Sequence, residues 1–139
     1  MNHFAKLHLQ TAEKNGKTYT IGELQNFPPF PIKRFYFVQG QPTDTGQHCH
    51  KIEEEFFVMI KGNCTAVIDQ GKGKEDVEFY GPGEALYVPN YVWHGFKNMS
   101  EDAILLALSS TNFNPDRSDY VEDYEEYLKI RDEGLRKGV

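Results

Sequence analysis

Three histidines and one carboxylate stand in two separate stretches of the chain. His48 and His50 flank Cys49, Glu55 follows after a short polar segment, and His94 lies far along the chain. On a strand, alternate side chains face the same side, so the two imidazoles of the pair would point in one direction. If the two stretches form neighbouring strands, the four side chains converge. Such a cluster suits metal binding or acid–base catalysis.

These two kinds of chemistry exclude one another in part. Three imidazole nitrogens and a carboxylate suit Fe(II), Mn(II), Ni(II) or Zn(II), which would be held by His48, His50, Glu55 and His94. Without a metal, the same imidazoles can shuttle protons, because the ordinary pKa of histidine lies near neutrality. A metal-bound nitrogen is no longer a free base. The sequence leaves both alternatives open.

Each of these residues also has a purely structural interpretation. The histidines can be hydrogen-bonded core residues. Glu55 ends a run of three glutamates that can be a solvated turn, and His94 follows Trp93 and can be held by aromatic packing. The coherent spacing of turn glycines around both stretches favours the functional interpretation of the histidines. For Glu55 the two interpretations are balanced.

Several further residues are candidates for the site or for the core. Arg34 and Tyr36 alternate on one strand and share a face, which gives a cation and a phenol on the same side, although a surface arginine is an equal alternative. Cys49 points away from the histidines and is assigned to the core. The tyrosines at positions 120, 124 and 127 are assigned to helix packing.

Short strands between turn signals must position these residues, as in an all-β sandwich or barrel. The histidine strand, residues 47–50, is one of the expected strands. The others are short runs bounded by turn signals: residues 7–12, 18–24, 32–38, 55–61, 64–69, 77–80, 85–88, 91–96 and 103–109. The last is almost wholly apolar and is expected to be central. After residue 112, apolar side chains recur at helical spacing. We expect one domain over residues 1–139, with a barrel over 1–112 and a helical tail over 113–139.

Composition excludes some classes of protein. The chain has 139 residues and a formal net charge of −6. It also has no basic run, which argues against a nucleic-acid partner. The longest apolar run, residues 103–108, is far too short to cross a membrane. Two cysteines are too few for a disulfide framework, so we expect a cytoplasmic protein.

The two histidine stretches resemble the two motifs of the cupin superfamily. The first motif is carried by the glycine-bounded pair with Glu55 and Gly62, and the second by Gly83, Pro89, His94 and Asn98. Within cupins, a longer part of the chain resembles the sugar-nucleotide 3,4-ketoisomerases. That match includes residues 32–34 with the aromatic strand that follows, residues 48–51, residues 91–94 and the tyrosine-rich stretch from residue 118.

The resemblance implies an all-β cupin (jelly-roll) barrel with a C-terminal helix, and a homodimer that needs no metal. The implied enzyme shifts the keto group of a dTDP-linked 4-keto-6-deoxysugar from C4 to C3 through an enediol. His48 and His50 would move the proton. Tyr36 would stabilise the developing oxyanion, and Arg34 and His94 would contact the substrate.

Three positions depart from the family pattern. Thr45 and Glu122 stand where the family tends to have arginine, and Glu55 stands where it usually has glutamine. The glutamate makes the pocket better suited to a metal. Two competing hypotheses therefore remain: a metal-dependent cupin enzyme acting on a small polar substrate, and a non-catalytic sugar-binding cupin.

Overall fold

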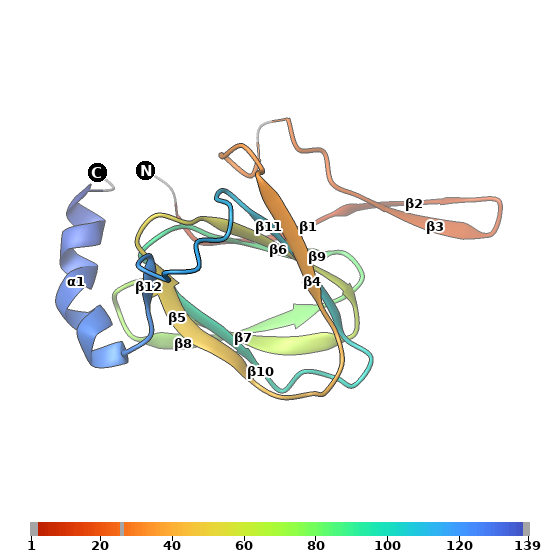
Figure 1. Ribbon diagram of the computed structural model, residues 1–139. Coiled ribbons are helices and arrows are strands. Elements are labelled where there is room, and N and C mark those ends of the chain that lie inside the picture. Colours follow the sequence, from red (N-terminus) through yellow and green to blue (C-terminus); the bar gives the residue numbers. More distant parts are fainter. Residues whose placement is uncertain (1–2, 26, 138–139) are drawn as a thin grey trace.

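Two five-stranded antiparallel sheets face one another in the computed structural model, which describes residues 3–25 and 27–137 and side chains as far as residue 132. The first sheet has the order β1 (Ala5–His8), β9 (Glu84–Val88), β6 (Glu55–Lys61), β11 (Ile104–Ser109) and β4 (Arg34–Val38). The second has the order β12 (Tyr120–Val121), β5 (Thr45–His50), β10 (Trp93–Lys97), β7 (Asn63–Asp69) and β8 (Lys74–Tyr80). This jelly-roll arrangement confirms the predicted fold class (Figure 1).

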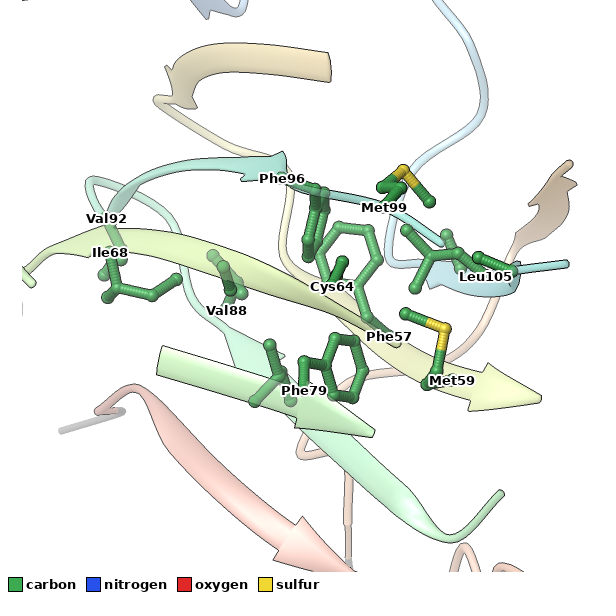
Figure 2. Close-up of a cluster of buried hydrophobic side chains, with 14 residues drawn as sticks. Phe57, Met59, Cys64, Ile68, Phe79, Val88, Val92, Phe96, Met99 and Leu105 are labelled. Carbon is green, nitrogen blue, oxygen red and sulfur yellow. The ribbon is translucent and has the colours of Figure 1, made fainter. Parts of the chain in front are cut away.

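The main core fills the space between the two sheets. Inward positions of facing strands supply it, and Figure 2 shows Phe57 and Met59 of β6 close to Phe79 of β8 and Phe96 of β10. Phe56 and Val58 alternate with them and lie in a second cluster on the outer face of the first sheet. β6 is therefore buried on both faces, and its inward side is fixed by apolar burial. The same alternation directs Glu55 inward.

The N-terminal hairpin lies apart from both sheets. Strands β2 (Gln10–Lys14) and β3 (Lys17–Ile21) pair only with one another and extend away from the barrel (Figure 1). Asn15 and Gly16 turn the chain with φ of 53° and 74°. Two successive positive φ angles are what a tight hairpin requires, and Asn-Gly tolerates them well. The turn falls between two strands that the sequence predicts, over residues 7–12 and 18–24.

The C-terminal segment differs from the expected helical tail. Helix α1 (Tyr124–Lys137) begins at Tyr124, and Asp123 caps it by accepting a hydrogen bond from the backbone N–H of Glu125 at 2.8 Å. The preceding residues Tyr120 and Val121 form β12, which pairs with His50 and Cys49 of β5. Assigning Tyr120 to helix packing was therefore wrong. Long-range pairing with β5 outweighs the local helical spacing in this stretch.

Helix α1 packs on the outer face of the second sheet, behind the histidine strand. Tyr127 is fully buried in a cluster with Cys49, Trp93 and Val121. The Tyr124 hydroxyl donates to the buried carboxylate of Asp69 at 2.5 Å. Cys49 thus lies in a core on the face opposite the histidines, as predicted. In the part of the chain that the structure describes, no helix is long and apolar enough to span a membrane.

Candidate active site

Two adjacent strands of the second sheet bring the three histidines together. His48 on β5 lies directly opposite His94 on β10, and the pairing register shifts immediately after this point. Gly46 has a φ of 82°, and a Cβ added to it would lie 2.9 Å from the Cα of Gly95. Side chains at these positions would push the strands apart, so the glycines permit the close approach of the histidine strands.

His48, His50, Glu55 and His94 converge inside the barrel, with one ligand atom of each lying within 4.8 Å of the others. The Nε2 atoms of His48 and His50 are 3.2 Å apart. An oxygen of Glu55 lies 3.3 Å from Nε2 of His50 and 3.4 Å from Nε2 of His94. Glu55 reaches the cluster from the opposite sheet, so the alternative of a solvated charge run is wrong for this residue. Its exposed fraction is 3%.

Strand β4 adds a phenol and a cation on one face, as the alternation predicted. The Tyr36 hydroxyl donates to Glu55 at 2.7 Å. The Arg34 guanidinium lies 5.1 Å from the centre of the Tyr36 ring and donates to Glu53 at 2.9 Å. Arg34 is therefore directed into the site region, and the alternative of an ordinary surface arginine is wrong.

The two central histidines have opposite electrostatic surroundings. Burial and the neighbouring imidazoles of His94 and His50 lower the pKa of His48 to about 3. Burial also opposes charge on His50, but hydrogen bonds to Asp119 and Glu55 outweigh it and raise the pKa of His50 to about 9. At neutral pH, His48 is therefore a neutral acceptor beside a charged donor, His50.

The carboxylate and the phenol take complementary protonation states. Burial alone would raise the pKa of Glu55, but hydrogen bonds to His50 and His94 hold that pKa well below its usual range. Burial and the adjacent Glu55 carboxylate raise the pKa of Tyr36 far above its usual value. At neutral pH Glu55 is ionised, and Tyr36 keeps its proton and can donate a hydrogen bond.

Two further carboxylates, which sequence reasoning missed, face the other ring nitrogen of His50. Asp119 Oδ2 lies 3.1 Å and Glu53 Oε2 lies 3.2 Å from Nδ1. Glu53 has an exposed fraction of only 4% and is held by Arg34 and by a hydrogen bond from the Ser109 hydroxyl. Local sequence gave no signal for Glu53. For Asp119 there was a signal. Asp123 is a recognisable helix N-cap, so Asp119 lies before the helix, in a segment that can reach the site.

Tyr120 also belongs to the site. Its ring centre lies 4.5 Å from that of His50 and 5.1 Å from that of His48. The Arg117 guanidinium covers the Tyr120 ring at 3.9 Å and pairs with Glu122 at 2.8 Å. Glu122 is one of the positions that depart from the family pattern, and its side chain takes part in this exposed ion pair. The cation near this part of the site is supplied by Arg117.

Two small cavities lie on either side of His50. The first has a volume of about 150 Å³, and its lining includes Tyr36, His48, Glu55 and His94, together with Thr45 at its edge. The second has a volume of about 170 Å³, and its lining includes Arg34, Glu53, Phe113, Asp119 and Tyr120. The first cavity gives a reacting molecule access to the histidine cluster.

The chemistry of the inner cluster also fits a divalent metal ion. Three imidazoles and one ionised carboxylate form a donor set used for Fe, Mn, Ni and Zn in proteins. His48, His50, Glu55 and His94 would hold such an ion, which would supply Lewis-acid polarisation of a substrate oxygen. The contacts of Glu55 with His50 and Tyr36 show that the same residues also satisfy one another by hydrogen bonding.

The paired sheets and their histidine-lined interior define the protein as a cupin. The family model described as "FdtA: WxcM-like, C-terminal" matches residues 2–132, and the chain belongs to this family. The resemblance inferred from the two histidine motifs is confirmed.

Relatives whose names state an activity match most of the chain. A TDP-4-oxo-6-deoxy-alpha-D-glucose-3,4-oxoisomerase from Aneurinibacillus thermoaerophilus is 30% identical over 119 residues, which span 84% of each chain. The crystal structure of a 3,4-ketoisomerase from Helicobacter canadensis matches 93% of this chain and 97% of its own, with 27% identity and a TM-score of 0.82. The WlaRB TDP-quinovose 3,4-ketoisomerase from Campylobacter jejuni matches 93% of this chain and 99% of its own, with 29% identity and a TM-score of 0.82.

Proposed function

We propose that this protein is a sugar-nucleotide 3,4-ketoisomerase, which moves the keto group of a nucleotide-linked 4-keto-6-deoxysugar from C4 to C3. The observation that carries the proposal is the contact between His48 and His50, whose Nε2 atoms lie 3.2 Å apart beside the inner cavity. One imidazole is neutral and the other charged at neutral pH, as a proton transfer between adjacent carbons requires. The relatives' names support the same activity.

The reaction needs a proton to leave C3 and a proton to arrive at C4. The hydrogen on C3 is acidic because the neighbouring C4 is a ketone, and its removal gives an enediol. The histidine pair accepts this proton and later returns a proton to C4. The C3 hydroxyl gives up its hydrogen as it becomes the carbonyl, and the C4 oxygen takes up a hydrogen as it becomes a hydroxyl, so one hydrogen also passes from O3 to O4 overall. Electrons and atoms balance without an oxidant, because the product is an isomer of the substrate.

Tyr36, Arg34 and His94 have supporting roles in this proposal. Tyr36 keeps its proton, and its single O–H turns from Glu55 to the developing enediolate oxygen, because a buried hydroxyl donor is most effective where negative charge forms. Arg34 orients the substrate, and His94 contacts the sugar in the inner cavity that it lines. The catalytic residues proposed are therefore His48, His50 and Tyr36.

The proposed substrate is dTDP-linked, and its nucleotide occupies the second cavity. Phe113 presents a half-exposed ring there, and the Arg34 guanidinium lies 5.9 Å from the ring centre. An aromatic face beside a cation suits a base and a phosphate of a nucleotide.

The direct test is product analysis by NMR after chelator-treated protein is incubated with dTDP-4-keto-6-deoxyglucose. The proposal predicts the 3-keto isomer, and it predicts that His50→Asn binds the substrate but does not convert it. Binding without conversion by the parent protein would favour a non-catalytic sugar-binding cupin. We propose that no cofactor is needed.

A metal-dependent enzyme acting on a small polar substrate is the second candidate. It is favoured by the four donor atoms of His48, His50, Glu55 and His94 within 4.8 Å. Elemental analysis of untreated protein and activity before and after chelation separate the candidates. Stoichiometric Fe, Mn, Ni or Zn, with activity lost on removal and restored on addition, would favour the second candidate and contradict the first.

We also propose that the protein is a homodimer. The β2–β3 hairpin is almost wholly exposed, and isolated two-stranded hairpins are marginally stable in water. β4 ends its sheet in the described chain and exposes 67% of Phe35 and 58% of Phe37. A second copy that packs its hairpin against this edge would cover both surfaces. Sedimentation should give a dimer, whereas only monomer at micromolar concentration would refute the proposal.

The proposed location is the cytoplasm. Cys49 and Cys64 are both unpaired and buried, which supports a reducing compartment. We propose no nucleic-acid or membrane partner, because the chain is acidic with a net charge of −6.

A further inference from the structure

Asp119 is fixed in place by the backbone of the turn that follows His50. Its Oδ1 accepts a hydrogen bond from the N–H of Ile52 at 2.6 Å, and its Oδ2 accepts from the N–H of Glu53 at 3.2 Å. Its own carbonyl accepts from the N–H of Lys51 at 3.0 Å. Both oxygens of the carboxylate are therefore oriented before any contact with the imidazole is considered.

The remaining contact of this carboxylate is with His50. Oδ2 lies 3.1 Å from Nδ1 of His50, and an ionised carboxylate can only accept a hydrogen bond. Nδ1 must therefore carry a hydrogen. The other ring nitrogen, Nε2, points the opposite way and contacts Nε2 of His48 and the Glu55 carboxylate.

We propose that Asp119 is a positioning residue that keeps a hydrogen on Nδ1 of His50, so that Nε2 is the atom that exchanges protons. The inference deepens the proposed function and rests on it for its catalytic meaning. Proton exchange at Nε2 connects His50 to His48, which borders the substrate cavity. If neutral His50 kept its hydrogen on Nε2 and left Nδ1 bare, Nε2 could not accept a proton from His48, and this connection would be interrupted.

Glu53 approaches the same nitrogen but acts differently. Oε2 of Glu53 lies 3.2 Å from Nδ1 as an ion-pair contact, whereas Oδ2 of Asp119 is in hydrogen-bonding position at 3.1 Å. Arg34 and Ser109 both donate to Oε1 of Glu53, so that carboxylate is anchored to the β4 and β11 side of the site. Asp119 lies in the C-terminal segment. That segment therefore supplies the hydrogen-bond partner of Nδ1 in the catalytic histidine.

In the variant Asp119→Asn, we expect the hydrogen of neutral His50 on the other ring nitrogen, Nε2. The 2.6 Å contact with the N–H of Ile52 requires an oxygen at the Oδ1 position. The amide nitrogen of asparagine then faces Nδ1 of His50 and donates to it. In neutral His50 we expect Nδ1 to accept from this amide and the hydrogen to move to Nε2, with the Glu53 carboxylate, 3.2 Å from Nδ1, acting against this change.

The experiment is ¹⁵N–¹H NMR of protein labelled at histidine, combined with steady-state kinetics, on wild-type, Asp119→Asn and Asp116→Asn. Asp116 is an exposed control in the same segment, and its side chain accepts from the backbone of Ser118 without contacting His50. The spectra are recorded above pH 9, where His50 is neutral. They should show a hydrogen on Nδ1 of His50 in wild-type and in Asp116→Asn, and a bare Nδ1 in Asp119→Asn. We expect kcat of Asp119→Asn to fall at least about 10²-fold, with KM changed less than about threefold.

Two results would overturn the inference. One is a bare Nδ1 in the wild-type spectrum, which is decisive even if Asp119→Asn does not fold. The other is a folded Asp119→Asn that keeps the hydrogen on Nδ1 or turns over at the wild-type rate. Asp119→Glu retains the carboxylate and should restore the hydrogen on Nδ1. Absence of turnover in the parent protein would refute the proposed function, whereas the NMR result would still decide the position of the hydrogen.

Discussion

The two sides of His50 differ in what they contribute to the site. Toward the inner cavity, His50 meets His48 and the Glu55 carboxylate, all supplied by regular barrel strands. Toward the second cavity, it meets Glu53 and Asp119, which come from a turn and from the C-terminal segment. The strands therefore place the groups that exchange protons. The irregular segments add the carboxylates of Asp119 and Glu53, which together with Glu55 keep His50 protonated.

The largest effect should follow from replacing either histidine of the pair. His48→Asn and His50→Asn should each lower kcat by at least about 10³-fold, because each removes one partner of the proton transfer. His8→Asn is the matched control, since His8 is exposed on β1. Turnover is measured by NMR of the sugar product. A His50→Asn variant with more than a tenth of wild-type kcat would contradict the assigned role.

The pH dependence of stability should separate the two sides of the site. The pKa of His50 is raised to about 9 in the folded protein, so its stabilisation is complete below about pH 6.5 and is lost as the pH rises through 9. The pKa of His48 is lowered to about 3, so its contribution is present above about pH 6.5 and is lost as the pH falls toward 3.

Equilibrium unfolding in urea at several pH values measures these contributions. We expect each to change the free energy of unfolding by a few kcal/mol. His50→Asn should flatten the dependence above pH 6.5, and His48→Asn should flatten it below that pH. Identical pH profiles for the two variants would show that the two imidazoles do not differ as described.

A smaller loss is expected when the phenol of the inner cavity is removed. Tyr36→Phe deletes the hydroxyl that donates to Glu55 at 2.7 Å and that stabilises the enediolate in the proposed reaction. Loss of one such donor should lower kcat about 10²-fold. Tyr19→Phe serves as the control, because half of the Tyr19 surface is exposed on the hairpin. A Tyr36→Phe variant with kcat within twofold of wild-type would exclude this role.

The smallest predicted effect concerns the second cavity. Phe113→Ala should raise the Kd for TDP about tenfold, because stacking of one base on an aromatic ring contributes about 1–3 kcal/mol. Tyr80→Ala is the control. It removes another half-exposed ring, which lies on β8 and is distant in sequence from Phe113, and it should leave the Kd for TDP unchanged. Calorimetric titration with TDP measures both. Equal affinities for Phe113→Ala and wild-type would place the nucleotide elsewhere.

The histidines of the inner side could be predicted from the sequence, whereas the position of Glu55 and the outer side could not. Alternation along a strand predicts that His48 and His50 face one way. The turn between His50 and Glu55 can reset which face points inward, and it is the burial of β6 in the fold that shows Glu55 on the same side as Phe57. Tyr120 fits the helical spacing of Tyr124 and Tyr127, and its pairing with β5 spans some 70 residues of chain. No local pattern reports such a contact. The capping aspartate at position 123 was the available sign that the helix begins later.

The most direct test of the account is a time course in deuterated water with metal-free protein and dTDP-4-keto-6-deoxyglucose. Proton transfer through the histidine pair predicts the 3-keto isomer with solvent deuterium at C4, formed at an undiminished rate after chelation. Recovery of unchanged, unlabelled substrate under conditions in which added metal restores turnover would contradict it. The cluster of His48, His50, Glu55 and His94 would then be a metal site.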